Sequence, residues 1–420
     1  DHRDLHSFPT RRSSDLDELF YSEPLHIVRG EDVWLYDAEG KKYLDVYNNV
    51  AHVGHSNPHV VEAITRQAKA LNTSTRYLHE NIVDLAEKIT ELMPGELEVC
   101  YFVCSGSEAN DLALQIARAY TKKQGCLVSE NAYHGNTTAV LQMSPDDCVP
   151  EKRQDWVQTL PSPKKYQQTE QIELNCLKDL SLAMDKFDEI GIGTAAVIFD
   201  SVFSSDGIFL PPPDYLKTTY GAVRQSGGLA IADEVQSGLG RIGSHMWGFS
   251  HDGVVPDIVT LGKPMGNGYP IAAVVTTRKI AQVFDQEYGY FNTFGGNPVA
   301  CAAALAVLEM MKKDHLMHNA ETTGLYFHQK LTELAEQHDL IAEVRGKGLF
   351  LGVELIDPIG KEPATKKTAE IVNLLSKNGT LVGITGPDSN VIKMRPPMTF
   401  NKRHVDRTVK NLDETLSSLF

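Results

Sequence analysis

Residues 257–268 read Asp257-Ile258-Val259-Thr260-Leu261-Gly262-Lys263-Pro264-Met265-Gly266-Asn267-Gly268. A short apolar run that ends in turn residues is typical of a strand buried on both faces of a sheet. This run delivers Lys263 into a turn rich in glycine and proline, which is unusual because burying a lysine charge is costly. Burial and nearby positive groups can lower the pKa of a lysine until it is nucleophilic, as Schiff-base chemistry requires. We therefore expect a reactive lysine at the end of a buried strand.

Similar apolar runs recur through the middle of the chain, at residues 99–104, 126–129, 195–199, 229–232 and 271–276. Amphipathic patterns lie between them. After the first run, apolar residues follow one face of a helix, at Ala109, Leu112, Ala113, Ile116, Ala117 and Tyr120. Short buried strands that alternate with helices predict an α/β domain with a mostly parallel sheet.

The two ends of the chain differ from the middle. Residues 33–45 predict a hairpin, and further strands are expected at 349–356 and 391–394, each after a helix. We expect both ends to pack together as a smaller α+β domain. The predicted organisation is a first part of the small domain at 17–55, a large domain at 56–304, and a second part of the small domain at 305–420. Residues 1–16 begin without methionine and show no periodicity, so we interpret them as a non-native or disordered leader.

Composition and charge disfavour several classes of protein. The 420 residues are 42% hydrophobic and 23% charged, as in ordinary globular proteins. The formal net charge of -15 is opposite in sign to the basic surface of a nucleic-acid-binding protein. The sequence contains no apolar stretch of about 18 residues, the length that would predict a membrane span. The six cysteines lack metal-site spacing and are interpreted as reduced, buried side chains, which predicts a cytoplasmic protein without a metal.

The segment Ser105-Gly106-Ser107-Glu108 opens the first helix. Ser105 and Glu108 have the spacing of a capping box. Gly106 allows close approach of the backbone to a ligand, and the free N–H groups and dipole of a helix start attract an anion such as phosphate. Taken alone, this motif more often means a plain helix cap.

Asp233 and Glu234 follow the run at 229–232. Ligands of open α/β sheets gather at the carboxyl ends of strands, so Asp233 is placed to meet one, although a solvated helix cap is an equally common reading. A phosphate cradle, an acid and a strand-end lysine together match pyridoxal 5′-phosphate (PLP), which needs a partner for its phosphate, its ring nitrogen and its aldehyde. We expect Lys263 and Asp233 to be catalytic, with the lysine also serving as the base that moves a proton.

On these motifs the chain resembles the class III (omega-type) aminotransferases, which are fold-type I PLP enzymes. The resemblance runs from about residue 17 to residue 420. It is strongest in the segments SGSEAND, AYHG, ADEVQSGLGR, TLGKPMGNG and FNTFGGNP. The resemblance implies a large domain with a mostly parallel sheet flanked by helices, plus a smaller α+β domain from both chain ends. It also implies that Lys263 carries PLP as a Schiff base and that Asp233 pairs with the ring nitrogen.

The same resemblance implies which other residues would surround the PLP ring. Tyr133 stacks on one face of the PLP ring, Val235 packs on the other face, and Gln236 hydrogen-bonds the ring hydroxyl. The remaining cofactor-binding residues that it implies are Ser105, Gly106, Ser107 and His134.

Two more residues take roles from the resemblance. Thr293 would reach the phosphate of the neighbouring subunit, which implies a homodimer with shared active sites. Arg395 matches the arginine that grips a carboxylate in family members acting on amino acids, and a guanidinium suits this task because it makes two parallel hydrogen bonds. Without the resemblance, Thr293 reads as a loop residue and Arg395 as a surface residue before a Pro-Pro turn.

The family resemblance implies transfer of an amino group between an amine or amino acid and a 2-oxo acid, and this transaminase activity is our first expectation.

One segment of the chain departs from the aminotransferase pattern. Many class III aminotransferases have Glu-Pro-x-Gln-Gly-Glu where this chain has Asp200-Ser201-Val202-Phe203-Ser204-Ser205. The second Glu can neutralise the carboxylate-binding arginine during half of the cycle. Ser205 cannot do so, which puts dual-substrate switching in doubt.

A narrower resemblance, at residues 48–55, 75–81 and 291–297, is to the PLP phospho-lyases. These enzymes eliminate phosphate and ammonia from an O-phosphorylated amino alcohol or amino acid, and this activity is the alternative expectation. In their pattern a lysine stands at the position of Arg395, so the arginine favours an amino-acid or keto-acid partner somewhat. A protein that has lost catalysis is disfavoured, because Lys263, Asp233 and the phosphate motif are all present.

Overall fold

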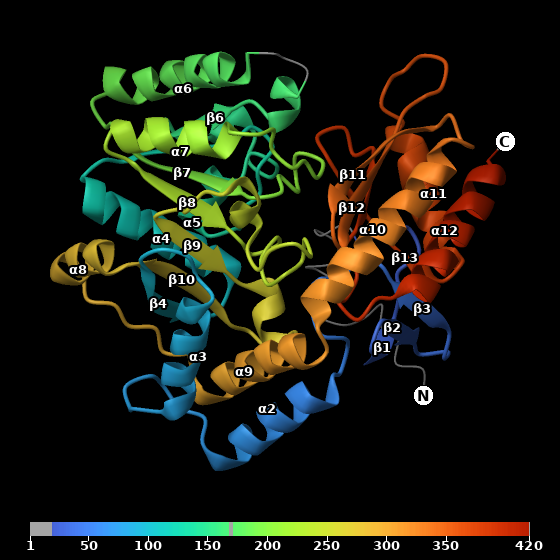
Figure 1. The fold of residues 1–420 in the computed structure, drawn as a ribbon, viewed down its shortest axis with the longest axis horizontal. Helices are drawn as coiled ribbons and strands as arrows, with labels where there is room; N and C mark the ends of the chain where they lie inside the picture. The colour runs from blue at the N-terminus through green and yellow to red at the C-terminus, as the bar shows by residue number, and fades with distance from the viewer. Residues whose placement is uncertain (1–18, 168–170, 420) are drawn as a thin grey trace.

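The computed structural model describes residues 19–167 and 171–419, which fold into two lobes (Figure 1). The large lobe contains a seven-stranded sheet with helices on both faces. The small lobe contains two four-stranded sheets beside the helices α10 (Leu316–Ala335), α11 (Thr365–Lys377) and α12 (Lys402–Ser417). The leader predicted at 1–16 lies outside the described residues.

The strands of the large sheet lie in the order β4-β10-β9-β8-β7-β5-β6. All pairings from β9 to β6 are parallel, whereas β10 runs antiparallel to both β4 and β9. The prediction of a mostly parallel sheet is therefore confirmed. In the order of the sheet, the strands span Leu97–Val103, Ala272–Thr277, Ile258–Leu261, Leu229–Asp233, Thr194–Asp200, Gly125–Ser129 and Val157–Leu160.

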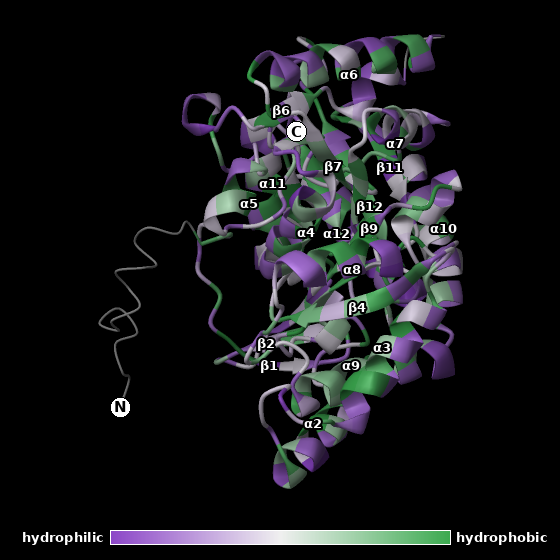
Figure 2. Cartoon of the chain, turned by 90° about the vertical axis from the view of Figure 1, so that its left-hand side faces the viewer, coloured by the Kyte–Doolittle hydropathy of each residue, from purple (hydrophilic) through white to green (hydrophobic). Residues whose placement is uncertain are grey.

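Helices cover both faces of this sheet, because successive strand residues point to opposite sides. Ile198 belongs to a core cluster with α4 and α8, while its neighbours Val197 and Phe199 belong to a second cluster with α6 and α7. Figure 2 shows the strands, such as β4 and β9, as hydrophobic, and the outer helices as mixed in character. The helices are α4 (Gly106–Thr121), α8 (Arg278–Glu287), α6 (Ile172–Glu189) and α7 (Tyr215–Gln225), with the short helix α5 (Thr138–Gln142) beside α4.

The small lobe joins the two ends of the chain. Its strands lie in the orders β1-β2-β3-β13 and β11-β12-β15-β14. The hairpin predicted at 33–45 is formed by β2 and β3, and β3 pairs with β13 from the C-terminal part. The strands span Ile27–Glu31, Trp34–Asp37, Lys42–Asp45 and Thr380–Leu381, and Ile341–Lys347, Phe350–Leu355, Val391–Met394 and Gly383–Thr385.

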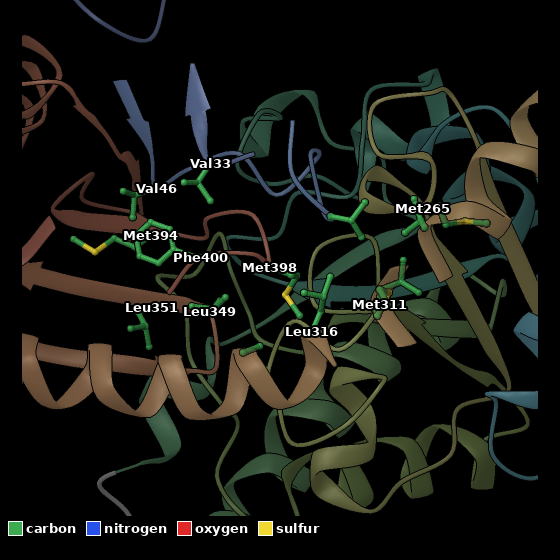
Figure 3. Close-up of a cluster of buried hydrophobic side chains, with 14 of the residues drawn as sticks. Val33, Val46, Met265, Met311, Leu316, Leu349, Leu351, Met394, Met398 and Phe400 are labelled. Atoms are coloured by element: carbon green, nitrogen blue, oxygen red, sulfur yellow. The ribbon is translucent and has the colours of Figure 1, made fainter. Parts of the chain in front are cut away.

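The lobes are connected by α9 (Pro298–Lys313), which packs on α2 (Pro58–Ala70) and α3 (Glu80–Glu91) below the sheet and leads into α10. The predicted domain limit at 304 falls inside α9, and the limits remain a prediction. One hydrophobic cluster runs across the junction of the lobes (Figure 3). It extends from Val33, Val46, Met394 and Phe400 through Leu349, Leu351, Met398 and Leu316 to Met311 and Met265.

Several features that could indicate other functions are not found in the described part of the chain. No helix there is both long enough and apolar enough to cross a bilayer. Nor do His, Cys, Asp or Glu side chains of residues 19–167 and 171–419 gather in groups that could hold a metal ion. The cysteines at 100, 104, 126, 148, 176 and 301 are free thiols.

Candidate active site

A pocket lies at the carboxyl ends of β8 and β9, beside the start of α4. It is lined by Gly106, Ser107, Tyr133, His134, Gly135, Asp200, Asp233, Val235, Gln236 and Lys263. The structure thus brings together most of the residues that the sequence singled out. A larger cavity between α3, α9 and α10 is lined by methionine, leucine and charged residues and by none of these candidates, so the smaller pocket is the candidate site.

Lys263 enters the pocket directly after β9, as the first residue of a 3-10 turn. Its φ of 35° lies in the left-handed region, which costs a non-glycine residue energy and is concentrated at functional sites. Burial of the amine, reinforced by repulsion from Arg395, lowers the pKa of Lys263 to about 8, although Asp233 and Asp200 act in the opposite direction. The lysine is therefore closer to its nucleophilic, neutral form than a lysine in water.

Asp233 is the last residue of β8 and is buried. Its Oδ2 accepts hydrogen bonds from His134 Nδ1 at 2.7 Å and from the Asn110 amide at 2.8 Å, and its Oδ1 accepts the N–H of Val235 at 3.0 Å. The Asn110 amide is held in turn, because its oxygen accepts the Thr260 hydroxyl at 2.7 Å. The carboxylate is thus fixed in orientation at the pocket wall.

Glu234, the second acid after the strand, turns away from the pocket. Its carboxylate accepts the N–H groups of Gly248 at 2.7 Å and Phe249 at 3.0 Å, and also the Ser201 hydroxyl. Burial raises the pKa of Glu234 to about 7. Of the two acids that end the strand, only Asp233 lines the pocket.

The start of α4 forms another wall. The Ser105 hydroxyl caps the helix by accepting the N–H of Glu108 at 3.2 Å. The Glu108 carboxylate accepts the N–H of Cys104 at 2.9 Å instead of the Ser105 N–H, so the reciprocal half of the predicted capping box does not form. The N–H groups of the first helical turn have no partner within the helix, which leaves those of Gly106 and Ser107 at the pocket.

This wall has no room for further side-chain atoms. A Cβ on Gly106 would lie 3.0 Å from Val235 Cγ1. A Cβ on Gly135, whose φ is +135°, would lie 2.3 Å from the Ser107 hydroxyl. Glycine at both positions keeps the backbone close to the space that a ligand would occupy, as a phosphate cradle requires.

Arg395 follows β15 and is buried on the small-lobe side of the site. Its guanidinium donates a hydrogen bond to the Gln236 side-chain oxygen and lies 4.7 Å from the centroid of the Tyr47 ring. The Gln236 amide donates to the Ser204 hydroxyl at 2.9 Å, and this hydroxyl donates to Asp200. A chain of hydrogen bonds therefore links Arg395 to the pocket.

Two residues of the site were missed in the sequence. Asp200 lines the pocket at the end of β7, but in the sequence it stood out only as the first residue of the segment that departs from the aminotransferase pattern. Lys393 is buried two residues before Arg395. Alternation along the predicted strand at 391–394 could have revealed Lys393, because residues two apart lie on the same face of a strand.

Thr293 does not lie with Lys263. It is exposed and lines a separate cavity together with Asn72, Thr73, Ser74, Cys104, Tyr269, Pro270, Phe294 and Asn297. The Thr75 hydroxyl donates to the Asn292 carbonyl at 3.4 Å, and the Arg76 guanidinium lies 4.0 Å from the Phe291 ring centroid. Residues 72–76 and 291–294 thus form one surface.

The residues of the pocket fit PLP in chemical type. A partly neutral amine, a fixed carboxylate and a glycine-walled helix start meet around one space. These are the three partners that the aldehyde, the ring nitrogen and the phosphate of PLP require. Val235 and Tyr133 supply an apolar and an aromatic wall.

Comparisons with known proteins agree with this chemistry. The model of the family Aminotransferase class-III matches residues 21–416. The chain is 43% identical over 417 residues to the alanine–glyoxylate aminotransferase 2-like protein of Drosophila melanogaster, covering 96% of this chain and 84% of that protein. It is 39% identical over 422 residues to ethanolamine-phosphate phospho-lyase homolog 1 of Caenorhabditis elegans, covering 95% of this chain and 90% of that protein.

Solved structures show the same relationship. A phospholyase from Arthrobacter in complex with phosphoethanolamine superimposes with a TM-score of 0.94 at 42% identity, covering 98% of this chain and 99% of that chain. An aminotransferase from Bacillus anthracis superimposes with a TM-score of 0.86 at 27% identity, covering 98% and 100%. The chain therefore belongs to the class III aminotransferase family, whose members use PLP.

Proposed function

We propose that this protein is a PLP-dependent phospho-lyase, which eliminates phosphate and ammonia from an O-phosphorylated amino alcohol or amino acid. The observation that carries the anionic character of the substrate is the state of Arg395. None of the ion pairs among residues 19–167 and 171–419 includes it, and its hydrogen-bond partners are the amide of Gln236 and the phenol of Tyr47. A buried cation with neutral partners is ready to receive an anionic group of a substrate.

Similarity to named proteins supports phosphate as that group. The Arthrobacter phospholyase is more similar to this chain, in identity and in TM-score, than the Bacillus anthracis aminotransferase. The loop after β7 also carries Ser205 where many aminotransferases have the glutamate that neutralises the arginine. An enzyme that works on a single anionic substrate has no need for such a gate.

Lys263 and Asp233 would carry out the central steps. When bound, PLP supplies an electron sink that stabilises a carbanion at the amine-bearing carbon. Lys263 would hold the cofactor through its aldehyde until the substrate amine takes its place there, and the Lys263 amine released by this exchange would take the proton from that carbon. Asp233 would keep a proton on the ring nitrogen, because three hydrogen bonds hold its carboxylate in place.

The other pocket residues would position the cofactor and the substrate. The N–H groups of Gly106 and Ser107 would bind the cofactor phosphate, with Ser105 capping the helix behind them. Val235 and Tyr133 would enclose the ring, and His134 would orient Asp233. Gln236 would lie at the ring hydroxyl. Arg395 would hold the leaving phosphate, whose C–O bond breaks as the electron pair of the neighbouring carbon forms the double bond. Water would then hydrolyse the released unsaturated amine to ammonia and a carbonyl compound.

Transamination is the second candidate. Arg395 favours it, because a guanidinium matches a carboxylate with two parallel hydrogen bonds. The Drosophila relative bears the name of an alanine–glyoxylate aminotransferase. In this case a 2-oxo acid would have to accept the amino group.

We further propose a homodimer with shared sites. Thr293 lies outside its own pocket, on a surface where Tyr77 is 69%, Leu78 100% and Phe294 69% exposed. Exposed apolar side chains gathered on one surface mark an interaction site, and a second copy would bring Thr293 to the other cofactor phosphate. A cytoplasmic location also remains a proposal.

The two candidate reactions are separated by one experiment. The purified holoenzyme is incubated with phosphoethanolamine in the absence of any 2-oxo acid, and inorganic phosphate and ammonia are measured. We expect both products in equal amounts. Release of neither, together with formation of glycine from alanine and glyoxylate, would overturn the phospho-lyase in favour of the transaminase.

A further inference from the structure

Lys393 lies on the face of β15 that looks toward the large lobe. Its strand neighbours Ile392 and Met394 belong to the hydrophobic cluster of the small lobe. Since neighbouring strand residues point to opposite faces, Lys393 lies on the opposite face, as does Arg395. Both cations are more than nine-tenths buried, at 6% exposure each.

The strands beside Lys393 present no side chains to it, and side chains of other segments pack there, such as Ile208, whose Cδ1 would lie 3.2 Å from a Cβ on Gly352. Its register partners are Gly352 on β12 and Gly383 on β14, neither of which has a side chain. The Tyr47 ring takes the space above Gly383, where a Cβ would lie 2.2 Å from the ring. The Lys393 amine lies 5.7 Å from the ring centroid of Phe350.

The charges that face Lys393 come from several elements. Arg395 and Lys263 repel its positive charge, while Asp200 at the end of β7 and Asp146 after α5 attract it. None of the ion pairs in the described ranges includes Lys393. Burial, together with the two cations, lowers the pKa of Lys393 well below its usual value. A buried lysine without an ion pair, beside a second unpaired cation, is costly unless a ligand compensates it.

We infer that Lys393 is a second substrate-binding residue, which forms with Arg395 a two-cation site for a dianionic group such as a phosphate monoester. A carboxylate has one charge and is matched by one guanidinium. A phosphate monoester carries nearly two charges on three oxygen atoms at neutral pH, so a second cation adds more to its binding. The inference deepens the proposed function by assigning the dianion, and not a carboxylate, to this end of the pocket.

Proton uptake on ligand binding distinguishes a Lys393 that binds the substrate from a Lys393 that only supports the fold. Burial shifts the protonation equilibrium of the Lys393 amine toward its neutral form. A dianion beside it favours the charged form, so binding draws a proton from the buffer. A lysine that only supports the small lobe would take up no proton.

The test uses the holoenzyme and two probes that lack an amine and cannot react with the cofactor. Ethyl phosphate serves as the dianion and propionate as the monoanion, and binding is measured by titration calorimetry in two buffers of different ionisation enthalpy. Lys393→Met should raise the Kd for ethyl phosphate by about 10- to 100-fold, as expected for a lost charged hydrogen bond. It should raise the Kd for propionate by less than about 3-fold. The variant should also abolish proton uptake. Lys330→Met, at a surface lysine on α10, is the control and should change neither.

The outcomes distinguish this inference from the proposed function. Unchanged binding of ethyl phosphate in Lys393→Met, or no binding of it by the unmodified holoenzyme, would overturn the inference. If Lys393→Met does not fold, Lys393→Gln makes the same comparison with a polar, neutral side chain. Binding that depends on Lys393, without release of phosphate from phosphoethanolamine, would uphold the dianion site and reject the phospho-lyase.

Discussion

The guanidinium of Arg395, after β15 of the small lobe, donates a hydrogen bond to the side-chain oxygen of Gln236, after β8 of the large lobe. The Gln236 amide is itself committed to the Ser204 hydroxyl at 2.9 Å. The neutral Gln236 side chain therefore occupies the position at Arg395 that an anionic group of a substrate would take. An incoming anion has only to displace an amide oxygen, which leaves no charge unpaired.

Replacing this neutral partner with an acid should close the site to anions. In Gln236→Glu the new carboxylate would pair with Arg395 and compete with the substrate. We expect KM for phosphoethanolamine to rise by about 10- to 100-fold, since charged hydrogen bonds contribute about 1.5–3 kcal/mol. Gln236→Met, which offers no competing charge, is the matched control. Steady-state kinetics check the prediction, and equal KM values for the two variants would contradict it.

The lowered pKa of Lys263 should appear in the stability of the protein freed of PLP. Its folded pKa of about 8 lies below the ordinary 10.5, so the protonated lysine destabilises the fold by about 3 kcal/mol below pH 8. Between about pH 8 and 10.5 the folded protein loses this proton before the unfolded chain does, and the penalty disappears. Lys263→Met should therefore be more stable than the parent at pH 7, and the difference should shrink toward pH 10.5. Urea unfolding at several pH values measures it, and a constant difference would contradict the shift.

Asp233 should be needed for turnover more than for folding. Asp233→Asn keeps the shape but not the charge that would face the ring nitrogen, and a buried pair that loses one partner costs about 3–5 kcal/mol. We expect kcat to fall by at least about 100-fold. Asp214→Asn, at the exposed start of α7, is the control. A fall in kcat of less than 10-fold would remove Asp233 from the proposed role.

Gly383 should tolerate no methyl group. Its Cβ would lie 2.2 Å from the Tyr47 ring, and overpacking of this kind costs about 1–3 kcal/mol. Gly383→Ala should therefore lower the free energy of unfolding by that amount and, by moving the ring beside Arg395, weaken anion binding. Gly221→Ala, in α7 with no atom within 4 Å of the new methyl group, should instead stabilise by about 0.5–1 kcal/mol. Equal effects of the two substitutions on urea unfolding would refute the packing argument.

Mixed dimers test whether the sites are shared. Lys263→Ala and Thr293→Ala subunits are unfolded together and refolded as a mixture. If Thr293 acts across the interface, each mixed dimer contains one intact site, and about a quarter of the parent activity returns from random pairing. If Thr293 acts within its own subunit, the mixture stays as inactive as its components.

The sequence predicted the interior of the large sheet well. The runs at 258–261 and 229–232 coincide with β9 and β8 because a strand buried on both faces has no polar side to hide its pattern. The edge strand β6 was missed because only its end residues are buried. The reversed direction of β10 could not be predicted, since a buried strand has the same composition in either direction.

The candidate site was predicted unevenly. Motifs in single segments placed Lys263, Asp233 and the start of α4 around one pocket. The contact between Arg395 and Gln236 joins segments 159 residues apart, and no local pattern encodes it. Lys393 could have been identified from strand alternation, because it lies two residues before Arg395 on the same face of the strand.

The hydrophobic cluster of Figure 3 passes from the small lobe to Met265, two residues beyond Lys263. Separating the lobes would expose this apolar surface to water, at a free-energy cost of about 25 cal/mol per Å². We therefore expect that neither lobe unfolds alone. Calorimetry of the protein should accordingly record one cooperative heat-absorption peak, in which the turn that carries the lysine is lost together with the strands of both lobes.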